Sequence, residues 1–77
     1  MSTSIRAFDA AFQEFSRYEI LLPGNPNTTY FKGYSMEGAG RRQTAAENYM
    51  RYLNAVRQGE YAKHAYRKLV EWGYIKK

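Results

Sequence analysis

Aromatic side chains constrain this chain more than any other feature of its sequence. Its 77 residues include eight tyrosines, four phenylalanines and one tryptophan, and no cysteine. A domain of this size without disulfides has a small hydrophobic core, so large side chains must supply most of the buried area. Only part of the aromatic set fits inside such a core. We therefore expect some tyrosines to be buried and others to form an exposed surface that binds a partner.

The hydrophobic spacing predicts one small, mainly α-helical domain that spans residues 1–77 and contains three helices. The expected helices are residues 5–22, a second that starts between residues 36 and 41 and ends near residue 57, and residues 60–72. The aromatic side chains expected in the core are Phe8, Phe12, Phe15, Tyr18, Tyr49 and Trp72. Gly73 is placed to end the third helix, because glycine adopts the left-handed conformation of a helix C-terminus.

Residues 28–34 interrupt the helical pattern. They are rich in β-branched and aromatic side chains, which favour extended backbone. The predicted fold is therefore a three-helix domain with one extended segment or short strand between helices 1 and 2. A strand here has residues 74–76 as its only candidate partner.

Basic residues are concentrated in the C-terminal part of the chain. The net charge is +5, but residues 1–30 hold two basic and three acidic side chains, so residues 31–77 carry +6. This asymmetry favours a nucleic acid, a nucleoprotein or an acidic protein surface as the partner. Arginine, lysine and tyrosine alternate there, which suits contacts with phosphates and stacking on bases. The candidate binding residues are Arg41, Arg51, Tyr52, Arg57, Tyr61, Lys63, Tyr66, Arg67 and Lys68.

Acidic residues leave a second interpretation of the third helix open. Glu60 and Glu71 lie on the same expected face as its basic residues and reduce the positive potential. That face is then simply solvated, with Tyr61 and Tyr66 at its margins.

A glycine-rich turn before the second helix is a candidate anion site. Its residues are Gly38, Gly40, Arg41 and Arg42. Glycines allow close backbone approach, and free N–H groups of the helix N-terminus add to the two guanidiniums. The alternative is that the glycines only let the chain turn. We also predict an ion pair between Glu19 and Arg42, which leaves Arg41 as the better anion ligand.

Several classes of function are not expected. His64 is the only histidine and cysteine is absent, so no metal site or other cofactor is predicted. The carboxylates are scattered along the chain, and no nucleophile–base pair is suggested by their spacing, so we do not expect an enzyme. The N-terminus lacks the apolar stretch of a signal peptide, and no segment approaches the roughly 18 apolar residues of a membrane span. These features predict a cytoplasmic protein without a membrane partner.

The sequence thus predicts a non-catalytic, small basic binding protein whose basic-aromatic surface contacts nucleic acid or a nucleoprotein complex. The alternative is a protein-interaction module, such as a small inhibitor or adaptor of the phage or mobile-element type, that docks through exposed tyrosines. A third alternative is a homodimer whose interface buries the surplus aromatic side chains.

Overall fold

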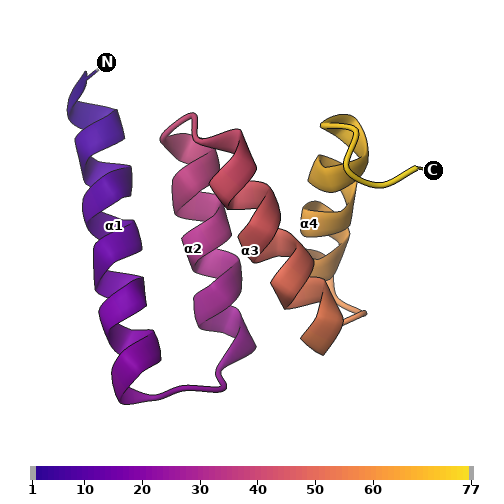
Figure 1. Ribbon diagram of the computed structural model, residues 1–77, viewed down its shortest axis with the longest axis horizontal. Helices are drawn as coiled ribbons and strands as arrows, with labels where there is room; N and C mark the ends of the chain where they lie inside the picture. The colour runs from indigo at the N-terminus through magenta and orange to yellow at the C-terminus, as the bar shows by residue number, and fades with distance from the viewer. Residues whose placement is uncertain (1, 77) are drawn as a thin grey trace.

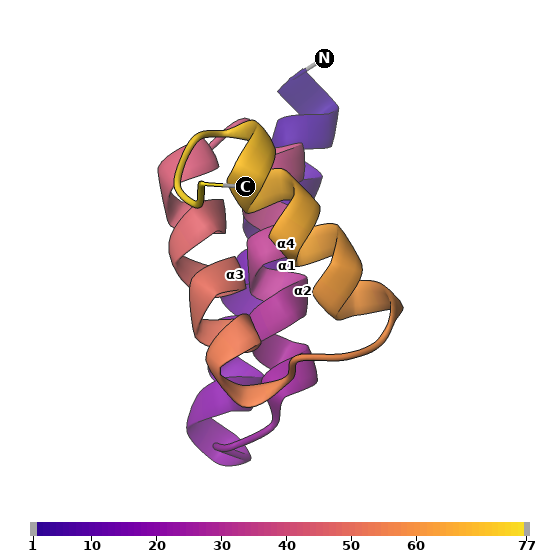
Figure 2. The same ribbon diagram turned by 90° about the vertical axis from the view of Figure 1, so that its right-hand side faces the viewer.

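The computed structural model describes residues 2–76, with side-chain environments from residue 6 onward. It contains four helices (Figure 1), which are α1 (Ser2–Leu21), α2 (Pro26–Gly38), α3 (Arg42–Ala55) and α4 (Glu60–Glu71). The main contacts follow chain order, from α1·α2 through α2·α3 to α3·α4. The molecule is a slab of 34 × 31 × 18 Å, with α1 and α4 at opposite edges. Figure 2 shows α4 crossing the other helices at an angle.

The predicted extended segment is wrong, because residues 28–34 lie within α2 and the described residues contain no strand. Asn25 caps this helix by accepting a hydrogen bond from the backbone N–H of Asn27 at 3.0 Å. Pro26 occupies the first turn, where its fixed φ favours the helix. Because α2 lies between α1 and α3, it is buried on two sides and shows no single apolar stripe in the sequence. The fold is mainly helical as predicted, but it has four helices.

The other helices lie close to their predicted positions. Gly73 has φ +86°, which allows the chain to reverse at the end of α4. The backbone N–H groups of Tyr74 and Ile75 then donate to the carbonyl of Leu69 at 2.9 and 3.3 Å. The predicted role of this glycine is confirmed, but residues 74–76 follow it without forming a strand.

Tyrosines and alanines make up most of the core. The main cluster of buried residues consists of Tyr30, Ala46, Tyr49, Tyr52, Ala62, Ala65 and Leu69. The alanines let the helices approach closely, and the tyrosine rings fill the remaining space. Each buried hydroxyl needs a polar partner, and no buried side-chain nitrogen or oxygen among the described residues lacks one.

Burial of the aromatic side chains follows the position of each helix in the slab. Tyr49 is fully buried as predicted, but Tyr18 is 56% exposed, so its assignment to the core is wrong. The other aromatic side chains predicted for the core are only partly buried, and they are Phe8, Phe12, Phe15 and Trp72. Because α1 is an edge helix with α2 as its main neighbour, only one face of it is covered.

Glu19 forms its ion pair with Lys32 rather than with Arg42, so the predicted partner is wrong. The Lys32 Nζ lies 2.8 Å from Glu19 Oε1, and Thr29 donates to Oε2 at 3.4 Å. The presence of α2 explains the difference, because it replaces α3 as the main neighbour of α1. The hydrogen bond from Lys32 is the main reason why the pKa of Glu19 is lowered from its usual value of 4.5.

We expect Glu19→Gln to lower the free energy of unfolding by about 1–3 kcal/mol at neutral pH. The Lys32 side chain is only 10% exposed, so the substitution leaves a largely buried ammonium without its carboxylate. A lowered pKa contributes stability above the unfolded value of 4.5, and this contribution is lost as the pH falls through the folded value. The difference between the two proteins in urea unfolding should therefore shrink as the pH falls below 4.5.

Glu47→Gln is the matched control, because it makes the same change at an exposed position on α3. It should change stability little at neutral or acidic pH. If the loss of stability in Glu19→Gln stayed constant as the pH was lowered, the assigned ion pair would be contradicted.

Candidate functional site

An exposed tyrosine on α4, Tyr66, separates two hollows in the surface. The larger hollow, of about 430 Å³, is lined by Leu53, Arg57, Ala62, Lys63, Tyr66 and Ile75. The smaller, of about 330 Å³, is lined by Tyr66, Arg67, Val70 and Glu71. The Tyr66 side chain belongs to both hollows and is 46% exposed. We name the group formed by Arg57, Lys63, Tyr66 and Arg67 the Tyr66 surface.

Local sequence explains why these four residues meet. Lys63, Tyr66 and Arg67 have i, i+3 and i+4 spacing, which places them on one face of α4. Arg57 lies between α3 and α4, where the chain turns back at Gly59 with φ +109°. Three exposed cations therefore line the same two hollows as one exposed ring, and Glu71 lines the hollow that contains Arg67. Such a surface can stack a flat ring on Tyr66 and contact anionic groups around it.

Tyr52 and Tyr61, the other two tyrosines predicted to bind a partner, do not line these hollows. Tyr52 is 3% exposed and packs on Tyr30 with 5.3 Å between ring centroids, so the predicted exposure is wrong. It is covered because α3 lies between α2 and α4, and burial raises its pKa. Tyr61 is exposed as predicted, but its ring also stacks on Tyr30 at 4.4 Å. Its contacts with the side chains of α2 place it apart from the two hollows.

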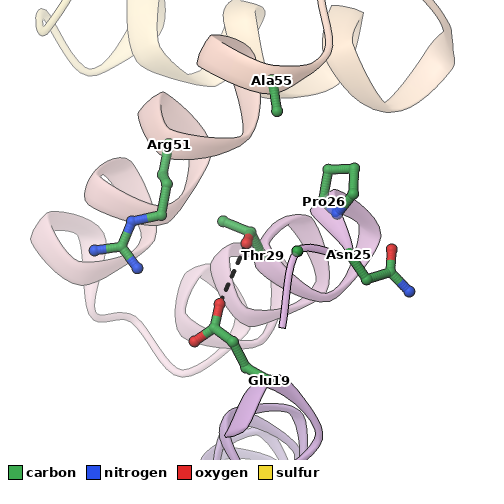
Figure 3. Close-up of a pocket in the computed structure, with 7 residues that line it drawn as sticks. Glu19, Asn25, Pro26, Thr29, Arg51 and Ala55 are labelled. Atoms are coloured by element: carbon green, nitrogen blue, oxygen red, sulfur yellow. Dashed lines mark hydrogen bonds between the residues drawn. The ribbon is translucent and has the colours of Figure 1, made fainter. Parts of the chain in front are cut away.

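Arg51 lies at a separate hollow of about 230 Å³ (Figure 3). Its lining includes Arg51 and Ala55 of α3, Glu19 of α1 and Pro26 of α2. The positive charge of Arg51 contributes to the lowered pKa of Glu19, after the larger effects of Lys32. Arg51 therefore does not share a hollow with the Tyr66 surface, although the sequence grouped it with the other basic residues.

The two arginines of the glycine-rich turn diverge. Arg41 donates from Nε and Nη2 to the two carboxylate oxygens of Asp9 on α1, at 3.2 and 3.3 Å. The guanidinium of Arg42 lies 5.8 Å from the ring centroid of Trp72. The prediction that Arg41 is the better anion ligand does not agree with this geometry, because Asp9 already holds its guanidinium.

The predicted anion site is only partly assembled. A hollow of about 190 Å³ is lined by Glu37, Gly40, Arg42, Lys68 and Trp72. It brings two cations together, but the carboxylate of Glu37 lies among them and opposes the binding of a second anion. Gly38 has a packing role, because a Cβ there would lie 2.6 Å from the Phe8 ring.

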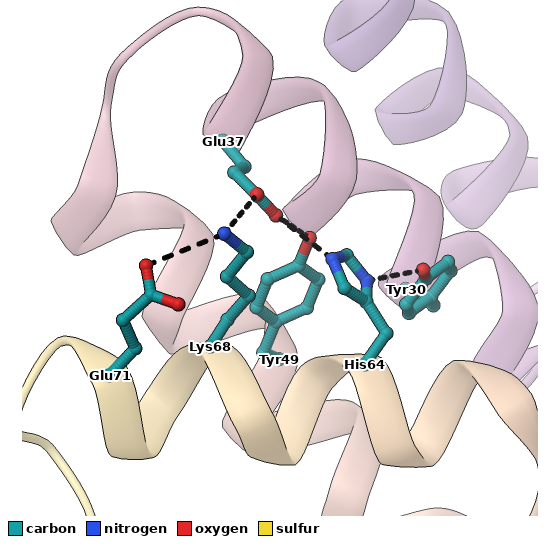
Figure 4. Close-up of polar contacts among 6 residues, drawn as sticks. All are labelled: Tyr30, Glu37, Tyr49, His64, Lys68 and Glu71. Carbon is teal, nitrogen blue, oxygen red and sulfur yellow. Dashed lines mark hydrogen bonds and ion pairs between the residues drawn. The ribbon is translucent and has the colours of Figure 1, made fainter.

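A cluster of polar side chains joins α2, α3 and α4 (Figure 4). Tyr49 donates its hydroxyl hydrogen to Glu37 Oε1 at 2.6 Å, and Lys68 Nζ lies 3.3 Å from Oε2. His64 Nε2 lies 3.5 Å from Oε1, and its Nδ1 lies 2.6 Å from the Tyr30 hydroxyl. Because a carboxylate only accepts, an imidazole with its proton on Nε2 suits this arrangement, and Tyr30 then donates to Nδ1.

This cluster is structural, because its tyrosine hydroxyls are not accessible. Tyr30 is 5% exposed and Tyr49 is fully buried. Burial, and then the negative charge of Glu37, raise the pKa of Tyr30 to about 12. Burial and the hydrogen bond to Glu37 raise the pKa of Tyr49 further. Lys68 pairs with Glu37 and, at 3.6 Å, with Glu71, so it is less available to a phosphate than the sequence suggested.

Residue spacing in the sequence does not reveal this cluster, because its members come from three helices. One signal was present: a core rich in tyrosine requires buried hydrogen-bond partners. Glu37 and His64 supply them, but residue spacing does not show which helix faces bring them together.

Comparisons with protein-family models, with curated proteins and with solved structures find no match to this chain. Over residues 2–76, the structure contains no helix with the length and apolar character required to cross a bilayer.

Proposed function

We propose that this chain is a non-catalytic binding protein that contacts nucleic acid, free or within a nucleoprotein complex, through the Tyr66 surface. One observation carries the proposal: the exposed Tyr66 ring lines two hollows, one of which is also lined by Arg57 and Lys63 and the other by Arg67. Successive phosphates of a strand can contact the cations while a base stacks on the ring. A ring stacks only on a base with a free face, so a single strand fits this surface better than a duplex.

We expect Tyr66→Ala to weaken the binding of a labelled single-stranded oligonucleotide by about tenfold or more, because base–aromatic stacking contributes about 1–3 kcal/mol per base. Arg57→Gln should make the dependence of log K on log salt less steep by about 0.7, the value for one phosphate contact on a single strand. Fluorescence anisotropy at several salt concentrations measures both effects.

Arg51→Gln is the matched control for Arg57→Gln. Both substitutions remove one exposed arginine charge, but Arg51 lies at the hollow beside Glu19. It should leave the affinity and the salt dependence nearly unchanged. Equal losses for the two variants would show that the net charge of +5 governs binding, and would contradict a localised surface.

A protein-interaction module is the second candidate function. The apolar side chains of Leu53, Ala62 and Ile75 line the larger hollow, which suits an anchor side chain from a protein partner. In that case Tyr66→Ala should abolish binding, whereas added salt and Arg57→Gln should have small effects. A pull-down from lysate with and without nuclease treatment distinguishes the two functions, because only nucleic-acid-dependent partners are lost after digestion.

A further inference from the structure

The outer face of α1 carries a stripe of four residues with a symmetric spacing. Ala10, Glu14, Arg17 and Leu21 are separated by four, three and four positions, which keeps them on one side of a helix. All four are exposed, and α1 has its main helix contact with α2. The side chains of Glu14 and Arg17 are 62% and 73% exposed, and Leu21 is 70% exposed.

Large exposed apolar residues occur near the C-terminal end of α1, namely Tyr18, Ile20, Leu21 and Leu22. Tyr18 and Leu21 are the two of these that lie at the stripe. A hollow of about 210 Å³ is lined by Glu14, Arg17, Tyr18 and Leu21. Single exposed apolar residues are ordinary, but two that line one hollow on the uncovered side of a helix favour an interaction surface.

The stripe is complementary to itself in the antiparallel direction. Since its spacing of four, three and four is the same in both directions, two copies of α1 can align all four positions at once. Each Leu21 then meets the small Ala10 of the other copy, and each Glu14 meets the other Arg17. Within one chain, Glu14 and Arg17 are 3.8 Å apart and highly exposed, so this pair stabilises the monomer little and is free to rearrange.

We propose that a second copy of this chain packs antiparallel against the outer face of α1, forming a twofold symmetric homodimer with two Glu14–Arg17 ion pairs and two Leu21–Ala10 contacts. In this isologous arrangement, each residue of the stripe has a partner on the other chain. Charge favours this face, because residues 1–30 carry a net charge of −1 whereas the rest of the chain carries +6. The dimer also leaves α4, at the opposite edge of the slab, accessible in both copies.

Sedimentation velocity over a range of protein concentrations, without nucleic acid, tests the proposal. The wild-type chain should show a concentration-dependent equilibrium between monomer and dimer. Glu14→Arg and Arg17→Glu each turn both ion pairs into like-charge contacts, so each should weaken self-association by about tenfold or more. An equimolar mixture of the two variants should restore dimers, because the two arginines of one chain then face the two glutamates of the other.

Two further variants test the stripe itself. Leu21→Asp should abolish the dimer, because it places a charge opposite Ala10. Glu47→Arg is the matched control, since it reverses an exposed acidic residue on α3, outside the stripe, and should leave the association unchanged. Circular dichroism of each variant verifies that the helices are intact.

Three results would overturn the proposal. They are a wild-type chain that stays monomeric at all concentrations, a mixture of charge variants that does not associate, and a Glu47→Arg effect as large as that of Glu14→Arg. A monomer that instead binds vesicles of anionic phospholipid, with binding lost in Leu21→Asp, assigns this face to a lipid surface and also overturns it. Because nucleic acid is absent from the assay, failure here leaves the proposed function of the Tyr66 surface unaffected.

Discussion

Raising the pH from about 9 to about 12 is expected to unfold this protein cooperatively, through the buried tyrosines of the core. The pKa of Tyr30 is raised from 10 to about 12, and that of Tyr49 is raised further. A raised pKa contributes stability that is fully present below the unfolded value of 10. This stability is lost as the pH rises towards the folded value, because the unfolded chain releases its protons first.

The expected loss is large for a domain of 77 residues. For Tyr30 alone, the shift of two pKa units corresponds to a decrease of about 2 kcal/mol in the free energy of unfolding by about pH 12. Tyr49 adds to this decrease, since its hydroxyl is buried against the carboxylate of Glu37. The total free energy of unfolding of such a small domain is on the order of 5 kcal/mol, so a decrease much larger than this unfolds it.

Tyrosinate absorbance and helical circular dichroism, recorded together against pH, measure this transition. The last part of the absorbance change should coincide with the loss of helix. Tyr30→Phe should lose less stability than the wild type between neutral and alkaline pH, by about 2 kcal/mol. Tyr66→Phe is the control, because this exposed residue should not alter the pH of unfolding. Complete ionisation of all eight tyrosines with the helices intact would contradict the assigned burial.

Gly33→Ala is expected to lower the free energy of unfolding by about 2 kcal/mol or more, although alanine is the better helix former. A Cβ at this position would lie 2.6 and 2.7 Å from two ring atoms of Tyr49, and 3.2 Å from the carbonyl oxygen of Ala45. Tyr49 is fully buried and its hydroxyl is held by Glu37, so its ring has no space into which to move. The gain of about 1 kcal/mol in helix propensity is smaller than the cost of overpacking.

Gly38→Ala is the matched comparison, since it places a methyl group elsewhere in the same helix. Its Cβ would lie 2.6 Å from the ring of Phe8, a partly buried side chain on the edge helix α1. This ring can move towards solvent, so we expect a smaller loss than for Gly33→Ala. Urea unfolding of both variants tests the difference, and a Gly33→Ala protein as stable as the wild type would contradict the close contact between α2 and α3.

Helix α2 is the element that the sequence did not predict. Its composition, with two threonines and several aromatic residues, is typical of a strand. The signals that decided its structure were nevertheless local: Asn25 as the cap and Pro26 in the first turn. Burial of α2 on two sides concealed the periodicity that identified the other helices.

The Tyr66 surface could be anticipated in part. The spacing of Lys63, Tyr66 and Arg67 places them together on any helix, and the spacing was sufficient to group them. The position of Arg57 near these three residues depends on the turn at Gly59 between α3 and α4. Arg51 is as basic as Arg57, and only the arrangement of α1 and α2 shows that it faces Glu19 instead.

The existence of the helices was therefore encoded locally, because capping and periodicity act between residues a few positions apart. Tertiary packing decided which face of each helix is covered, and it buried Tyr52 while leaving Tyr18 exposed. It also brought His64 of α4 into contact with Glu37 and Tyr30 of α2. These contacts depend on the order of helices in the slab, and that order results from the whole chain minimising exposed apolar surface while pairing each buried polar group.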